Sequence, residues 1–210
     1  MSGPQKKSNQ RGKALRVLLA VCRVLPFALV IGKVFYHTDI RQYGSKNLGG
    51  GNAGRVLGKK AGVAVMTLDI LKVALVVFLA QSFFHSELAI ACGGLAAAIG
   101  HCYPLFANFK GGKAVATMYG FLFGLFVFAS YGPLIFFLPL IVFLIVLYLG
   151  KIIALASIVS AVAATIYAAF CGASLPILTA LILFSLLILV RHRKNLERIA
   201  KHEENKISWM

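Results

Sequence analysis

The chain has 210 residues and a formal net charge of +16, yet 60% of its residues are hydrophobic and only 13% are charged. This composition excludes an ordinary soluble domain, in which about a quarter of the residues are charged. The excess of lysine and arginine does not indicate a nucleic-acid partner, because the cations lie at the ends of apolar runs and the aromatic residues lie inside those runs.

Apolar runs close to the ~20 residues that a helix needs to cross a bilayer recur along the chain. The N-terminus resembles a secretory signal, but Arg23 interrupts its apolar part and no small-residue cleavage site follows. We therefore expect an all-α, polytopic membrane protein with a basic tail at 1–13, a transmembrane domain at 14–190 and a polar tail at 191–210. The seven predicted helices cover residues 14–36, 61–83, 87–106, 114–130, 133–149, 152–170 and 173–190.

Charge is distributed unevenly between the predicted loops. The loops after the first, third, fifth and seventh helices share one face and carry lysine and arginine, whereas the other loops carry neither. The positive-inside bias assigns the basic face to the cytoplasm. The basic residues of the tail 1–13 do not follow this bias, because seven helices would place that tail outside the cell.

The first polar stretch is Gly44 to Lys60, GSKNLGGGNAGRVLGKK. Its glycines allow close approach of the backbone to a ligand, and its amides and cations suit anionic oxygens. No carboxylate lies between Asp39 and Asp69 to neutralise it. The alternative is a flexible basic loop that touches lipid headgroups.

Two further basic stretches follow the third and seventh predicted helices. In Lys110-Gly111-Gly112-Lys113, two ammonium groups flank amides that we expect to be free for an anion, close to the positive end of the next helix. In His192-Arg193-Lys194-Asn195, His192 has the ring of a proton carrier near neutral pH. Taken singly, the second stretch also fits a plain basic turn at the membrane surface, and the third fits a basic stop-transfer run. Together they predict a site for two anionic groups beside the hydrocarbon.

Asp69 and Lys72 lie three residues apart inside the second predicted helix, and therefore on one face. Each would cost about 2.5–3.5 kcal/mol at the centre of a membrane helix. We expect them to face protein and to form a structural ion pair rather than to contact substrate. The cysteines are far apart and lack C-x-x-C spacing, which favours small buried hydrophobes over a disulfide or a metal site.

The three basic stretches resemble the motifs of the bacterial membrane acyl-phosphate:glycerol-3-phosphate acyltransferases, the PlsY family. The first stretch matches through Gly44-Ser45, Asn52 and Arg55; the second through Gly100-His101, Pro104 and the KGGK run; the third through His192-Arg193 and Asn195. The likeness covers about residues 30–198. The chain departs from the family pattern at Lys46, at Gly50-Gly51, where the family has Ala-Thr, and at Ala114, where it has glycine.

The resemblance implies a seven-helix bundle in the bacterial plasma membrane with its active site facing the cytoplasm. It implies transfer of a fatty acyl group from acyl phosphate to the 1-hydroxyl of glycerol 3-phosphate, giving lysophosphatidate and phosphate. We expect a monomer that needs no cofactor, no metal and no partner besides its substrates and membrane lipid. The residues implied as catalytic are Ser45, Arg55, His192 and Asn195, and those implied in phosphate binding are Asn47, Gly49, Asn52, His101, Lys110, Gly111, Gly112 and Lys113.

An acyl phosphate is an activated mixed anhydride, so the site needs only to hold two phosphates, align the hydroxyl and stabilise the developing oxyanion. The proton acceptor is either His192 or a phosphate oxygen of the donor. Two other functions remain open at this stage. One is a small transporter or channel for organic phosphates, for which the sequence shows no internal repeat. The other is a lipid-binding scaffold, in which Asn47 and Asn52 would be dispensable.

Overall fold

The computed structural model describes residue 12 and residues 26–207, and this part of the chain is helical and contains no strand. The all-α prediction is confirmed. The elements in order are α2 (Phe27–Tyr36), η1 (Ile40–Gln42), α3 (Gly50–Val56), α4 (Lys59–Phe84), α5 (Glu87–Cys102), η2 (Leu105–Ala107), α6 (Val115–Phe128), α7 (Leu134–Gly150), α8 (Ile153–Phe170), α9 (Leu175–Arg191) and α10 (Arg193–Ala200).

Helices α4 to α9 reproduce the last six predicted helices with small shifts at their ends. The main difference is at 87–106, where the helix ends at Cys102 because Pro104 disfavours helical backbone in the residue before it. Of the predicted helix 14–36, only 26–36 lies in the described part, where α2 begins at Phe27. Two segments outside the predicted helices hold short helices: α3 lies in the glycine-rich stretch and α10 in the polar tail.

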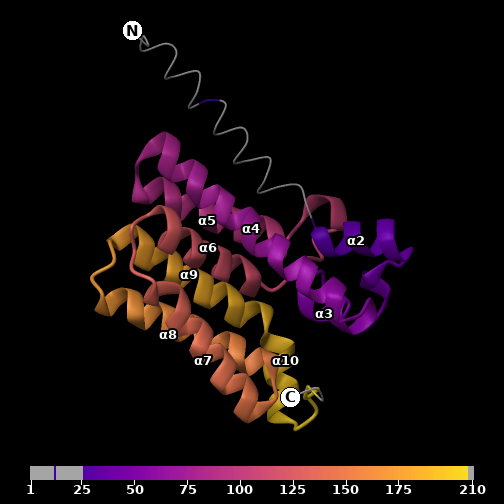
Figure 1. Ribbon diagram of the computed structural model, residues 1–210. Coiled ribbons are helices and arrows are strands. Elements are labelled where there is room, and N and C mark those ends of the chain that lie inside the picture. Colours follow the sequence, from indigo (N-terminus) through magenta and orange to yellow (C-terminus); the bar gives the residue numbers. More distant parts are fainter. Residues whose placement is uncertain (1–11, 13–25, 208–210) are drawn as a thin grey trace.

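The long helices lie side by side, with α2 and α3 at one end of α4 and α10 at the end of α9 (Figure 1). Helix α4 packs against α5 and α6, α9 packs against α5 and α8, and α7 packs against α8. This arrangement brings the end of α5, the start of α6 and the end of α9 close to the glycine-rich segment before α4.

The close packing of α4 against α6 depends on glycine. A Cβ on Gly120 would lie 2.3 Å from the carbonyl oxygen of Ile70, and one on Gly124 would lie 2.6 Å from Cβ of Val77. Glycines four residues apart form one stripe on a helix, and in membranes such stripes let two backbones approach closely. The short distance between α4 and α6 is therefore possible because Gly120 and Gly124 have no side chain.

Tyr119 ties three helices together in the interior. Its Oη lies 3.1 Å from the carbonyl oxygen of Pro139 in α7 and 3.0 Å from Oγ of Ser160 in α8. A buried hydroxyl without partners would be costly in an apolar bundle, so these contacts fix how α6 sits against α7 and α8.

Within the described part of the chain, α4 and α8 are each long and apolar enough to cross a membrane. Helices α9 and α10, bent by 56° where they meet, make a third span if they are counted together. Helices α2, α5, α6 and α7 are apolar but shorter. Large apolar side chains such as Phe170, which is 91% exposed, lie on the outside of the bundle, where a bilayer would cover them. The count of seven spans stays a prediction.

We predict that Gly120→Ala destabilises the bundle, because overpacking a close helix contact costs about 1–3 kcal/mol and the atom it meets is backbone. Thermal unfolding of purified protein in detergent should show a fall of several degrees. Gly132→Ala is the matched control, since a Cβ there meets nothing within 4 Å. Equal unfolding temperatures for the two variants would contradict the close α4–α6 contact.

Candidate active site

The three basic stretches meet at one place. Nδ2 of Asn47, in the first stretch, donates a hydrogen bond of 3.0 Å to the carbonyl oxygen of Gly111 in the second. Nζ of Lys113, in the second, donates one of 2.6 Å to Oδ1 of Asn195 in the third. Residues 64 and 82 positions apart in sequence are thereby joined directly.

Arg191, the last residue of α9, adds a second connection. Its Nε donates to the carbonyl oxygen of Gly112 at 3.1 Å and its Nη2 to that of Gly111 at 3.2 Å. The guanidinium also lies 5.1 Å from the centre of the Tyr103 ring. In the sequence, Arg191 served only as a signal of topology, although its place next to His192 could have marked it as part of the site.

Asn52 organises the first stretch from within. Its Oδ1 accepts from the backbone N–H of Ser45 at 2.8 Å, and its Nδ2 donates to the carbonyls of Ile40 and Tyr43 at 3.1 and 3.2 Å. The residue is 3% exposed. The amide of Asn52 is thus directed at the loop backbone, and its expected contact with phosphate stays a prediction.

The other residues of the first stretch differ in exposure. The side chains of Ser45 and Arg55 lie at the surface, Asn47 is half-buried, and Gly49 is the residue before α3 in extended backbone. A Cβ on Gly49 would lie 2.9 Å from Oδ1 of Asn47, so glycine leaves room for that amide. Ser45 and Arg55 are thus accessible to a ligand, and Asn47 is already bound to the second stretch.

The second stretch does not present free glycine amides. The N–H of Gly111 donates to the carbonyl of Cys102 and that of Gly112 to the carbonyl of His101, at 3.1 and 2.9 Å. The expectation that these two amides are free is therefore wrong, because both already donate to backbone carbonyls. Glycine is needed here for close approach, since a Cβ on Gly112 would lie 1.8 Å from Nε2 of His101. Lys110 is exposed and available to an anion.

His101 lies beneath this loop, and its side chain is 4% exposed. Its Nδ1 is 3.2 Å from Nζ of Lys72, which forms the expected buried ion pair with Asp69. The ion-pair prediction is confirmed. The ring is covered by Gly112 and faces α4, and the expected role of His101 in phosphate binding stays a prediction.

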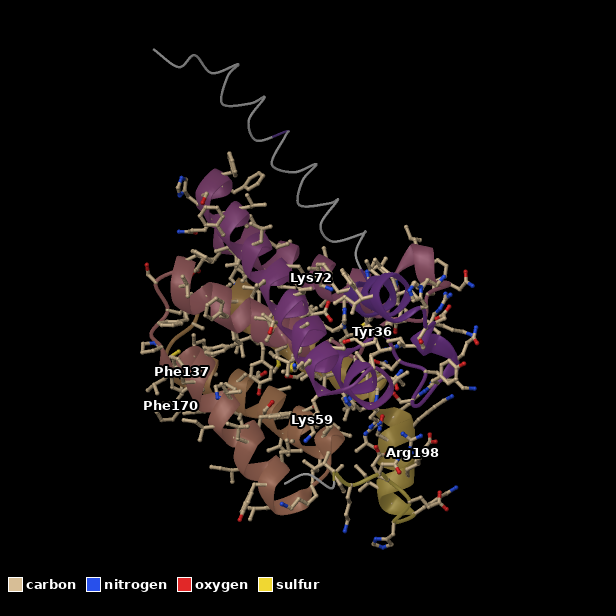
Figure 2. The ribbon with its side chains drawn as sticks, turned by 45° about the vertical axis from the view of Figure 1, so that its right-hand side comes forward. Tyr36, Lys59, Lys72, Phe137, Phe170 and Arg198 are labelled. Atoms are coloured by element: carbon tan, nitrogen blue, oxygen red, sulfur yellow. The ribbon has the colours of Figure 1, made fainter. Side chains whose placement is uncertain are left out.

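Lys113 and Asn195 belong to a polar chain that ends in the C-terminal segment. Nδ2 of Asn195 donates to Oε1 of Glu204 at 2.7 Å, and Nε of Arg198 donates to Oε2 of Glu204 at 2.6 Å. Figure 2 shows Arg198 on α10. Glu204 and Arg198 were absent from the predicted site, because their sequence context is typical of a solvated tail.

Burial lowers the pKa of Lys113 to about 8; the carboxylate of Glu204 opposes this shift, and the charges of Arg198, Arg55 and Arg191 add to it. Lys113 is half-buried among arginines, so its charge costs more than that of a surface lysine. An anionic ligand that binds next to Lys113, in addition to the carboxylate of Glu204, would therefore meet several cations.

His192 lies where α9 turns into α10 and is 3% exposed. Its Nδ1 is 2.8 Å from the carbonyl oxygen of Ile188. Because a carbonyl only accepts, Nδ1 carries the proton and Nε2 keeps its lone pair. Burial lowers the pKa of His192 to about 4, and the Lys113 ammonium adds to this shift. The ring is therefore neutral at pH 7 and can accept a hydrogen bond at Nε2.

Two of the departures from the family pattern, at Gly51 and Ala114, have different consequences. Gly51 is exposed, and a Cβ on it would meet nothing within 4 Å, so the side chain missing there leaves open space. Ala114 is buried and has φ +61°, a left-handed conformation that glycine adopts without strain. Among the described residues, no three His, Cys, Asp or Glu side chains gather to hold a metal ion.

These features define an apolar helical membrane protein with a cationic, partly buried candidate site at one end. The sequence model of the family described as glycerol-3-phosphate acyltransferase matches residues 17–202. The glycerol-3-phosphate acyltransferase of Geobacillus kaustophilus is 42% identical over 197 residues, which cover 93% of this chain and 96% of the relative. That of Listeria monocytogenes EGD-e is 44% identical over 200 residues, with the same coverage.

Two crystal structures are similar over 93% of this chain and 96% of theirs. Both are of PlsY (YgiH), an integral membrane glycerol 3-phosphate acyltransferase. Its glycerol 3-phosphate form has a TM-score of 0.84 at 33% identity, and its lysophosphatidic acid form 0.83 at 32%. The chain belongs to the glycerol-3-phosphate acyltransferase family, and it is an integral membrane acyltransferase of the PlsY type.

We predict that Asn52→Ala acts through stability. It leaves one amide and two carbonyls of the loop without partners, at about 1–3 kcal/mol for each group that stays buried. The unfolding temperature in detergent should fall by several degrees, while the exposed Asn205→Ala control should not change it. A normal unfolding temperature with a raised KM would instead assign Asn52 to the substrate.

Proposed function

We propose that this protein transfers a fatty acyl group from acyl phosphate to the 1-hydroxyl of glycerol 3-phosphate, giving lysophosphatidate and inorganic phosphate. The observation that carries the proposal is the joining of three cationic stretches through the Asn47–Gly111 and Lys113–Asn195 hydrogen bonds. A reaction between two phosphate-bearing substrates needs cations for both. Membership of the glycerol-3-phosphate acyltransferase family supports acyl transfer as the reaction.

The reaction asks little covalent chemistry of the protein. The hydroxyl oxygen attacks the acyl carbon, the bond from that carbon to the phosphate oxygen breaks, and phosphate leaves with the electron pair. Holding the hydroxyl and the carbonyl together, with cations near the developing negative charge, lowers the barrier. A carboxylic–phosphoric anhydride is already activated, so the donor itself provides the driving force.

The side chains divide into two groups. Ser45, Arg55 and Lys110 are accessible and would contact the phosphate groups, together with the half-buried Lys113. Asn195 would act beside them by holding Lys113, since its Oδ1 already accepts from that ammonium.

His192 would bind the glycerol hydroxyl at Nε2, because Nδ1 is committed to Ile188. With a pKa of about 4, the ring is a weaker base than a phosphate dianion, whose conjugate acid has a pKa of about 6. We therefore assign the proton of the attacking hydroxyl to a phosphate oxygen of the donor, with His192 holding the hydroxyl in line.

The membrane setting follows from the same features. Seven spans would place the joined stretches on the cytoplasmic face, where lysine and arginine concentrate. We propose that the enzyme acts there as a monomer.

A phosphate transporter finds less support. A cavity of about 510 Å³ lies at the far end of α6, lined by residues of the α6–α7 and α8–α9 turns. Its charged residue is Glu87, which accepts a hydrogen bond of 2.8 Å from Tyr131. A carboxylate repels phosphate, so this end is unsuited to its passage.

The central test is turnover by purified protein in detergent, with palmitoyl phosphate and glycerol 3-phosphate as substrates and released phosphate as the readout. We predict that Arg55→Ala and Lys113→Ala each lower kcat/KM by about 10²-fold or more, as does loss of a charge-stabilising donor in other enzymes. Lys194→Ala, an exposed cation on α10, should leave it unchanged. Full activity of both site variants would refute the phosphate assignment, and an inactive wild type would refute the reaction.

Alkaline pH should weaken the enzyme through Lys113. The ammonium is charged below its pKa of about 8 and is lost as the pH rises through that value. Because kcat/KM reports the free enzyme, we predict a fall of about tenfold between pH 7 and pH 9. Lys113→Arg keeps its charge and should remove this fall, whatever its absolute rate. Parallel profiles for the two proteins, corrected for spontaneous hydrolysis of the donor, would rule out Lys113 as the titrating group.

A further inference from the structure

A buried trio of ionisable side chains lies directly under the loop that carries Lys110 and Lys113. Asp69 is 1% exposed, and the side chains of Lys72 and His101 are 10% and 4% exposed. Lys72 lies part of the way along α4 (Figure 2), and His101 lies in the last turn of α5. The trio thus connects two helices at the base of the site.

The contacts within the trio fix the orientation of the histidine. The Lys72 ammonium contacts Oδ1 of Asp69 and lies 3.2 Å from Nδ1 of His101, while Nδ1 lies 3.5 Å from the same carboxylate oxygen. An ammonium has donors only, so it serves both acceptors and Nδ1 has no proton. The proton of the neutral ring is then on Nε2, the atom that faces Gly112.

His101 supports the loop with both its backbone and its ring. Its carbonyl oxygen accepts the N–H of Gly112 at 2.9 Å, and its Nε2 occupies the space that a Cβ on Gly112 would need. Gly112 precedes Lys113, and Gly111 accepts the hydrogen bond from Asn47. A shift of the ring would therefore move the backbone between the two lysines and its connection to the first stretch.

A purely structural pair would be expected to satisfy both carboxylate oxygens. Oδ2 of Asp69 is buried and has no hydrogen-bond partner within the described residues. Replacing a buried ion pair by apolar residues is often neutral or stabilising, so stability alone is a weak reason for these charges. The carboxylate oxygen that has partners is Oδ1, which contacts Lys72 and lies close to His101.

The geometry points to Asp69 and Lys72 as positioning residues of the acyl transfer, which act through His101 to hold the Lys110–Lys113 loop where its cations meet phosphate. This inference rests on the proposed reaction, since turnover is its readout. It assigns a role in kcat/KM to a pair that touches neither substrate.

The test removes both charges together, because a single neutral substitution leaves a buried unpaired charge. Asp69→Leu/Lys72→Met keeps an apolar filling but gives Nδ1 of His101 no donor. We expect the unfolding temperature in detergent to stay within a few degrees of wild type, the KM for glycerol 3-phosphate to rise, and kcat/KM to fall at least tenfold. Lys72→Arg keeps charge and donors and should retain at least a third of the wild-type kcat/KM.

A double variant with wild-type kcat/KM would overturn the inference and leave the pair a structural role. If that variant fails to fold, ¹⁵N NMR of histidine-labelled wild-type protein decides, with His101→Asn identifying the signal. An unprotonated, hydrogen-bonded Nδ1 supports the inference that Lys72 holds His101, and a protonated Nδ1 overturns it. An inactive wild type would count against the proposed reaction. The NMR result would still show whether Lys72 donates to Nδ1 of His101.

Discussion

The carbonyl groups of Gly111 and Gly112 are the point on which the site depends. They accept hydrogen bonds from Asn47 and from Arg191, which reach them from opposite sides of the sequence. The amides of the same two residues are bound to the end of α5. A four-residue loop is thereby fixed by a glycine-rich segment, by α5 and by α9 at once. Fixing it from three sides compensates for the flexibility that glycine brings.

A membrane protein that collects cations at one place must balance their repulsion. Glu204 does part of this, because its two oxygens bind Asn195 and Arg198 and its charge favours the protonated form of Lys113. The remaining positive charge is left for ligands. Two anionic substrates would complete the balance, which makes binding and catalysis depend on the same charges. Salt should weaken the exposed contacts more than the half-buried one.

The fold was largely predictable, because long apolar runs interrupted by short polar turns leave few choices for helices α4 to α9. The three stretches of the site were also predictable, because each places lysine or arginine next to glycine, histidine or asparagine and the three follow the motifs of one family in order. Their internal roles were not. Asn52, His101, Gly111 and Gly112 are residue types that bind phosphate elsewhere, and only the position of neighbouring carbonyls shows that they shape the backbone here. Glu204 becomes part of the site through its hydrogen bonds with Asn195 and Arg198, which no rule of sequence spacing gives.

The division between residues that shape and residues that bind also explains which changes the chain tolerates. Gly51 faces open space, so the side chain that the family carries there can be lost without disturbing a neighbour. Ala114 sits at a buried, left-handed position and bears a strain of about 1 kcal/mol that glycine would relieve. The chain can carry this strain because Ala114 follows Lys113 directly, and Lys113 is held by Asn195 from the other side. Ala114 keeps its left-handed backbone between the anchored Lys113 and the start of α6, so the shape of this loop is set by its contacts and not by the glycine pattern alone.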